Sequence, residues 1–169
     1  MAASTTLVPV EEYLNTNYKP ACDYIDGVLR PKSMPTWNHS LLQARLIVLI
    51  AQGYPEFAAG PEATVQIRTG KFLVPDLIVQ ERDRIQSPYP TEPVHLCVEI
   101  LSPGDRLSEA IGKCEEYHEW GVETTWIIDP DERRAWEYRN GRRLQEIPTA
   151  GSLNAGAISI PCAEIFAGL

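Results

Sequence analysis

The sequence predicts an α/β fold in which a mixed β-sheet is flanked by helices. The first observation is a strand, a helix and a strand in succession between His95 and Ile128, an order that makes a crossover with the two strands parallel. The second is a series of short apolar runs separated by turn residues, which indicates further strands. The third is Asp26-Gly27 between two strand-like segments, which is typical of a β-hairpin near the N-terminus.

The N-terminal part is predicted to hold a short helix, this hairpin and a long helix. Residues 10–14 form the short helix, with acidic residues in its first turn, and the hairpin pairs residues 22–25 with 28–30. Two prolines then break the chain. Thr36 is a suitable N-cap for a helix that ends at about Gly53 and whose later turns are wholly apolar, as expected of a helix that enters a core.

The central part is predicted to hold three strands and the crossover helix. Residues 64–68 and 72–80 are strand-like and flank a Thr-Gly turn, and residues 95–101 form a third strand that Ser-Pro-Gly ends. A helix follows over residues 107–120, where apolar or small side chains recur at spacings of three and four.

The C-terminal part adds a fourth strand over residues 124–128. Residues 135–139 with Asn140-Gly141 begin a terminal hairpin. There is no internal repeat, and no linker separates halves of different composition. We therefore expect a single domain over residues 1–169.

Composition limits the functions that fit this domain. Of the 169 residues, 44% are hydrophobic and 22% are charged, which suits one soluble core. Fifteen Lys and Arg against 23 Asp and Glu give a net charge of −8, which excludes a broadly basic protein that coats nucleic acid. Any phosphate contact must therefore be local or mediated by a metal ion.

Neither a membrane span nor a disulfide framework is predicted. The longest apolar run, residues 46–51, is far shorter than the roughly 20 residues that a span needs, and residues 1–6 lack the basic start of a signal peptide. The four cysteines contain no C-x-x-C pair, so we expect buried free thiols. These features predict a cytoplasmic protein.

Two carboxylates interrupt the apolar pattern of their predicted strands. Because side chains alternate along a strand, Asp76 shares a face with Val74 and Ile78, and Glu99 likewise shares a face with apolar neighbours. Burying a lone carboxylate costs several kcal/mol unless a cation or N–H donors compensate it. One divalent cation would satisfy both acids. The alternative is that each acid lies at a strand end and faces water.

Lys113 lies on the helix that follows the Glu99 strand, on the side away from its apolar stripe. One interpretation is a surface ion pair with Glu109, four residues earlier. The other is that Lys113 reaches over the helix edge toward the two acids, where a cation polarises an attacking water or stabilises charge on a phosphate.

Five segments and one histidine carry a resemblance to a known family. They are Asp23 to Gly27, His39, Leu73 to Leu77, Val98 to Arg106, Lys113 to Val122 and Trp126 to Pro130. In this combination they resemble the Uma2 family of endonucleases, also called DUF820, which belongs to the PD-(D/E)XK nuclease superfamily. The resemblance covers nearly the whole chain and implies a restriction-endonuclease-like core with an N-terminal hairpin.

The resemblance also implies a metal centre. Asp76 and Glu99 would be its ligands together with the backbone carbonyl of Ile100, and such oxygen donors suit Mg²⁺ or Mn²⁺. The superfamily pattern has a lysine two residues after the second acid, where this chain has Leu101. The resemblance implies that Lys113, on the following helix, replaces that lysine.

Three further residues are auxiliary candidates. Asp23 is shorter than the glutamate that family members often carry at this position. His39 shares a helix face with Gln43 and is either a structural histidine, which the absence of metal-ligand spacing favours, or a contact near the site. Tyr117, four residues after Lys113, either lines the same cleft or packs in the core, and its place beside the apolar stripe favours packing.

Together with these residues, the resemblance implies a metal-dependent endonuclease that hydrolyses DNA phosphodiester bonds, with Lys113 stabilising charge rather than acting as the nucleophile. A homodimer is expected because the long apolar helix, four Trp and the terminal hairpin offer more apolar surface than one core can hide. The alternative is a non-catalytic module that binds nucleic acid or protein, which the acidic balance and Leu101 favour. A hydrolase of small phosphoesters is a third interpretation.

Overall fold

A six-stranded mixed sheet is the centre of the computed structural model, which describes residues 6–139, 141 and 143–169. Its strands follow the order β10-β9-β8-β7-β6-β3. They are β3 (Phe57–Pro61), β6 (Leu77–Glu81), β7 (Leu96–Ile100), β8 (Thr124–Asp129), β9 (Arg134–Arg139) and β10 (Arg143–Ile147). Strands β7 and β8 are parallel, and the remaining neighbours in this sheet are antiparallel. The predicted mixed sheet is confirmed.

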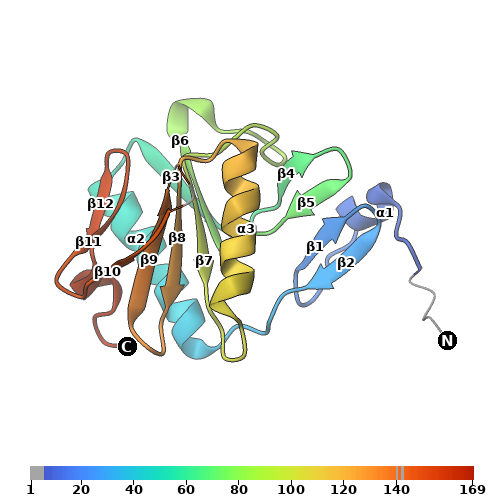
Figure 1. Cartoon of the computed structure of the whole chain (residues 1–169). Coiled ribbons are helices and arrows are strands. Elements are labelled where there is room, and N and C mark those ends of the chain that lie inside the picture. Colours follow the sequence, from blue (N-terminus) through green and yellow to red (C-terminus); the bar gives the residue numbers. More distant parts are fainter. Residues whose placement is uncertain (1–5, 140, 142) are drawn as a thin grey trace.

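Two long helices cover opposite faces of this sheet (Figure 1). Helix α2 (Trp37–Gly53) buries Leu42 and Leu46 against a core that includes Leu77 of β6 and Val98 of β7. Helix α3 (Leu107–Trp120) connects β7 to the parallel strand β8 and packs Cys114 against the other face. The predicted crossover is therefore confirmed. Alternate side chains of β6 and β7 supply the two cores, because successive residues of a strand point to opposite faces.

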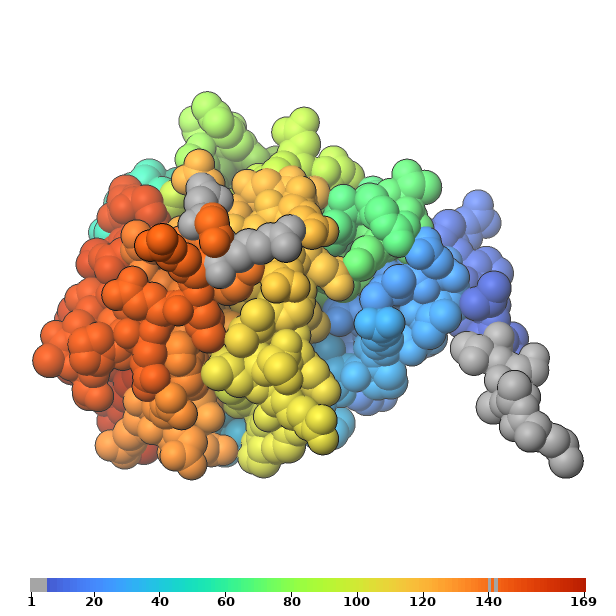
Figure 2. All heavy atoms as spheres, in the orientation of Figure 1, coloured from blue at the N-terminus to red at the C-terminus, as the bar shows by residue number. Residues whose placement is uncertain are grey.

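A smaller sheet projects beside α3 and forms a lobe with the N-terminal helix (Figures 1 and 2). Its strand order is β2-β1-β5-β4. The elements of this lobe are α1 (Val10–Leu14), β1 (Cys22–Ile25), β2 (Val28–Pro31), β4 (Val65–Arg68) and β5 (Lys71–Leu73). Asp26 and Gly27 both have positive φ, 47° and 90°, as a type I′ turn requires, so the predicted hairpin is confirmed.

The predicted strand over residues 72–80 is wrong in one respect, because it is two strands. Strand β5 ends at Leu73 and β6 begins at Leu77, so the chain passes from the small sheet to the large sheet through residues 74–76. Pro75 has no N–H to give to a ladder. The Val74 N–H instead donates to Asp23 Oδ1 at 2.7 Å, and the Val74 carbonyl accepts from Lys32 Nζ at 2.8 Å. Side chains thus replace the ladder at this joint.

Several elements were not predicted. They are β3, the hairpin of β11 (Ser152–Ala155) and β12 (Ile158–Pro161), the 3₁₀ turn η1 (Arg82–Arg84) and the C-terminal helix α4 (Cys162–Ile165). The terminal hairpin of β9 and β10 is confirmed, although Asn140 of its predicted turn and residues 1–5 lie outside the described residues. The four cysteines are buried and free. No helix in the described part of the chain is long and apolar enough to span a bilayer.

Candidate active site

The two predicted acids come together where β6 and β7 meet the joint between the sheets. Leu77, the first residue of β6, pairs with Val98 in the antiparallel ladder, and Asp76 and Glu99 are the next residues along the chain on either side of this pair. The Asp76 carboxylate accepts from the N–H of Ile100, the residue after Glu99. Both acids are nearly buried, at 3% and 6% exposure, and both line a cavity of about 500 Å³, which we call the acid pocket.

Asp76 is held by donors from three parts of the chain. Lys32 Nζ lies 2.5 Å from Oδ1, and His39 Nε2 lies 3.3 Å from the same oxygen. The N–H of Ile100 donates to Oδ2 at 2.6 Å. Burial raises the pKa of Asp76, but the hydrogen bond from His39 and the charge of Lys32 outweigh it, so the pKa lies well below its usual value. Asp76 is therefore ionised at neutral pH.

Glu99 has a different environment on the α3 side of the sheet. The Tyr117 hydroxyl donates to Oε1 at 2.6 Å, and Lys113 Nζ lies 3.4 Å from Oε2. Burial raises the pKa of Glu99, Lys113 opposes this, and the nearby Asp76 carboxylate adds to the rise. Glu99 is thus the acid of the pair that keeps its proton to higher pH. Tyr117 both packs in the core and lies against this acid.

Lys113 reaches over the edge of α3 toward the acids. This was one of the two interpretations of the sequence. Its ammonium lies 3.2 Å from Asp23 Oδ2 and 3.4 Å from Glu99 Oε2, and Glu109 is not among its ion-pair partners in the described residues. Burial lowers the pKa of Lys113, but the charges of Glu99 and Asp23 outweigh this and hold the pKa above its usual value. Lys113 is therefore a permanent cation that links the small sheet to the acid pair.

Helix α2 presents two side chains to the Asp76 residue. Thr36 caps the helix by accepting from the His39 backbone N–H at 3.2 Å, which fixes the first turn. The His39 ring contacts Asp76. Gln43, one turn later, donates to the Asp76 backbone carbonyl at 2.6 Å. His39 Nδ1 is buried and has no hydrogen-bond partner within the described residues. The structure thus places His39 against the acid pocket.

Lys32 is the residue of this site that the sequence reasoning missed. It lies between β2 and α2, its side chain is 12% exposed, and it is 44 positions from Asp76 in the sequence. No periodic pattern marks a residue between two elements. A lone lysine beside a proline carries no signal of burial, so only the tertiary structure reveals its position.

The donor set of the acid pocket fits a hard divalent cation in its chemistry. Two carboxylates and the Ile100 carbonyl are oxygen ligands of the kind that Mg²⁺ prefers. No group of three or more His, Cys, Asp or Glu side chains in the described residues is arranged as a metal site. Lys32 Nζ lies within 2.5 Å of Asp76 Oδ1, so a cation on this oxygen requires the lysine side chain to swing away.

Comparisons with known proteins concern the family and the fold of the chain. Residues 10–164 match the Uma2 family, whose description is "Putative restriction endonuclease". The fold resembles "a putative nuclease belonging to DUF820" from Anabaena variabilis ATCC 29413, with a TM-score of 0.78 and 21% identity over 94% of this chain and 97% of that chain. A chain of the DrdV–DNA complex gives a TM-score of 0.47 at 18% identity over 66% of this chain and 10% of that chain.

No curated protein matches the sequence. The family match nevertheless extends over almost the entire described structure, and the similarity to the Anabaena variabilis protein confirms the predicted fold class. The chain therefore belongs to the Uma2 family of nucleases.

Proposed function

We propose that this protein is a metal-dependent endonuclease that hydrolyses phosphodiester bonds of DNA in the acid pocket. The observation that carries the proposal is the convergence in one cavity of Asp76, Glu99 and Lys113, which come from the joint before β6, from β7 and from α3. Two buried acids in one cavity, with Lys32 and Lys113 beside them, are suited to bind a cation and an anionic phosphate together.

Each residue has a distinct part in this proposal. Asp76, Glu99 and the Ile100 carbonyl hold the divalent cation, which supplies an activated water and neutralises phosphate charge. Asp76 is ionised without any rearrangement, and the Tyr117 hydroxyl fixes the orientation of Glu99. Lys113 remains protonated and stabilises the charge that develops on the phosphate.

The acid pocket supplies local cations for a phosphate, although the chain carries a net charge of −8. Four cationic side chains, Arg30, Lys32, Arg106 and Lys113, line it together with six acidic ones. Phosphate contacts can therefore be local, as the composition requires. A non-catalytic module could use the same cations to bind nucleic acid. Only a measurement of DNA cleavage, and not of DNA binding, therefore tests the proposal.

Plasmid nicking in Mg²⁺ or Mn²⁺ tests the proposal. The parent protein should nick supercoiled DNA, Asp76→Asn and Glu99→Gln should not, and Lys113→Ala should be slowed at least about a hundredfold, as when one charge-stabilising donor is removed. Lys71→Met is the matched control, because Lys71 also forms a partly buried ion pair, with Glu116, without contacting either acid.

Two outcomes contradict the proposal. Nicking that is equal in the parent and all three site variants would place the reaction elsewhere. A parent that cleaves neither duplex nor single-stranded DNA with either metal would favour the non-catalytic module.

A further inference from the structure

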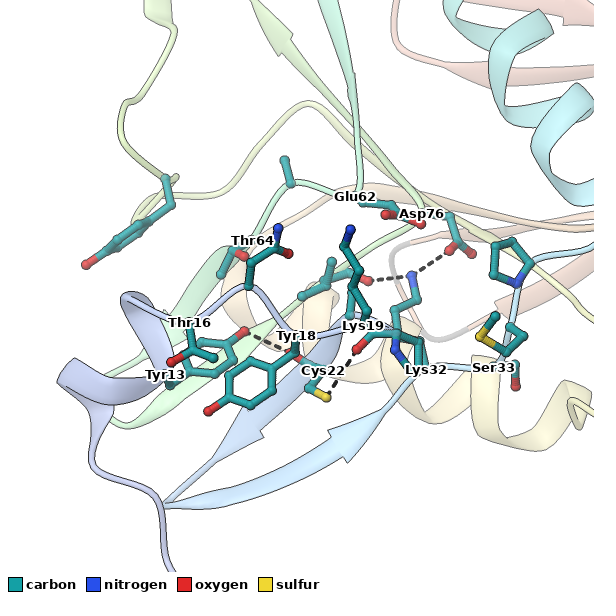
Figure 3. Close-up of a pocket in the computed structure, with 18 of the residues that line it drawn as sticks. Tyr13, Thr16, Tyr18, Lys19, Cys22, Lys32, Ser33, Glu62, Thr64 and Asp76 are labelled. Carbon is teal, nitrogen blue, oxygen red and sulfur yellow. Dashed lines mark hydrogen bonds and ion pairs between the residues drawn. The ribbon is translucent and has the colours of Figure 1, made fainter.

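A second cavity adjoins the acid pocket on the side of the N-terminal lobe. It has a volume of about 890 Å³, and Lys32, His39 and Asp76 line it as well as the acid pocket. The two cavities therefore share a wall formed by these residues. Figure 3 shows this second cavity, with Asp76 at one end and the tyrosines of the lobe at the other. We call it the tyrosine pocket.

A column of aromatic rings ends in the tyrosine pocket. Tyr24 stacks on Tyr13 with ring centroids 4.9 Å apart and planes at 28°. Tyr13 stacks in turn on Tyr18, at 5.9 Å and 20°. The first two rings are buried, whereas Tyr18 is partly exposed and lines the cavity. Within the described residues Tyr13 is the one ring that stacks on Tyr18, so Tyr18 ends the column at the cavity.

Hydrogen-bonding groups of both kinds surround this aromatic surface. The lining includes Lys19 and Lys32 as donors, Glu62 as an acceptor, and Thr64, which can act as either. In the view of Figure 3, Lys19 and Lys32 lie between Tyr18 and Asp76. An aromatic platform beside mixed donors and acceptors is the combination that recognises the face and the edge of a nucleobase.

We propose that the tyrosine pocket holds an unpaired nucleobase of the substrate strand, stacked on Tyr18, while a neighbouring phosphate lies beside Lys32, which lines both cavities. This inference rests on the proposed function of the acid pocket and adds the substrate class. A paired base is stacked inside the duplex and cannot enter a side cavity. The preferred substrate is thus DNA with an unpaired or extruded nucleotide, and a cavity of this size is within the usual range for a ligand of that kind.

Binding of matched DNA probes, in EDTA so that nothing is cleaved, tests this inference. The first probe is a fluorescent 21-base-pair duplex with one bulged thymidine, and the second is the same duplex with an abasic bulge. The parent should bind the thymidine bulge about tenfold more tightly, in line with the strength of stacking of one base on an aromatic ring. Tyr18→Ala should bind both probes with equal affinity, at the level of the abasic probe.

Two further variants separate the ring from its surroundings. Tyr18→Phe keeps the ring and should keep the tenfold preference. Ile85→Ala is the control, because it removes an exposed apolar side chain, 53% exposed, that does not line the tyrosine pocket. If the parent binds both bulges with equal affinity, the inference is overturned before any variant is measured. A preference for the thymidine bulge that survives in Tyr18→Ala would overturn it as well.

Failure of the inference and failure of the proposed function are distinguishable. A parent that nicks plasmid DNA but shows no preference for the thymidine bulge keeps the nuclease proposal and loses the base pocket. A parent that shows the preference but never cleaves keeps the base pocket and loses the nuclease proposal.

Discussion

At the scale of single residues, two carboxylates of similar chemistry differ because of their neighbours. Asp76 accepts from Lys32, His39 and a backbone N–H, whereas Glu99 accepts from one hydroxyl and a lysine 3.4 Å away. The pKa of the first acid is lowered and that of the second is raised. In the absence of metal, Asp76 is thus ionised, whereas Glu99 holds its proton more tightly.

Glu99 should make stability depend on pH. Its folded pKa lies above the unfolded value of about 4.3, so its stabilising contribution is complete below that pH and is lost as pH rises through the folded pKa. The depressed pKa of Asp76 has the opposite sign, and its contribution is lost only in stronger acid. Urea unfolding in EDTA from pH 4.5 to 7.5 should therefore show the parent losing stability relative to Glu99→Gln. Exposed Glu109→Gln is the control, and parallel curves for parent and Glu99→Gln would contradict this prediction.

Lys32 should compete with a metal ion for Asp76. Lys32→Met leaves the buried carboxylate without its closest cation, and we expect the protein without metal to lose about 2–4 kcal/mol of unfolding free energy. Because a metal ion no longer displaces an ammonium, the rise in melting temperature on adding Mn²⁺ should be larger than in the parent. Thermal unfolding with and without Mn²⁺ measures both effects. Lys71→Met should show the parent's Mn²⁺ shift, and the same shift in Lys32→Met would show that the lysine does not occupy the metal position.

At the scale of elements, the site depends on where helices begin and strands end. The first turn of α2 carries His39 and is closed by the Thr36 cap. Thr36→Ala should lower the unfolding free energy by about 1 kcal/mol, and Thr36→Ser should restore most of it. Chemical denaturation checks both. An unaffected Thr36→Ala protein would mean that Gln43 and the core hold this end of the helix without the cap.

Helices, strands and turns that nearby residues specify could be predicted from the sequence. Those that depend on contacts with residues far away in the sequence could not. The Asp-Gly turn, the Thr36 cap and the crossover helix all have local signals, and each was confirmed. Strand β3 reads Phe-Ala-Ala-Gly-Pro, which has no alternation, and it exists because β6 pairs with it. The segment of β5 and β6 resembles a single strand in the sequence apart from Pro75, and contacts of Val74 with the distant residues Asp23 and Lys32 help to divide it.

The same distinction applies to the candidate site. Asp76 and Glu99 were predictable because a charge within an apolar pattern is visible in the sequence, and Lys113 because it lies on the helix that directly follows the Glu99 strand. The structure brings the three together. The face assigned to Asp76 rested on a continuous strand with Val74, which the structure does not have. Lys32 could not be found because its partner is 44 residues away.

At the scale of the whole molecule, the predicted homodimer cannot use the terminal hairpin as its apolar interface and needs another surface. The terminal hairpin hides Trp136 and Tyr138 in the core, so it offers little apolar surface. The large apolar side chains that remain most exposed are Met34 and Trp37, at 72% and 78%, next to the start of α2.

Light scattering at micromolar concentration tests the dimer. The parent should give twice the mass of the chain, and Trp37→Ser should shift the protein toward the monomer. Exposed Val48→Ser, on the same helix, is the control for loss of an apolar side chain. A monomeric parent would show that one chain is the unit in solution.

The joint at Val74 has a consequence for how this protein can change. Asp23 holds the N–H of this peptide and also contacts Lys113, while Lys32 holds its carbonyl and also contacts Asp76. The two side chains that anchor the backbone are therefore the same two that balance the charges of the pocket. A substitution that retunes reactivity at either position also loosens the connection between the sheets. Adaptation of this enzyme to a new substrate should therefore proceed through residues such as Tyr18, which line the cavity without supporting the joint.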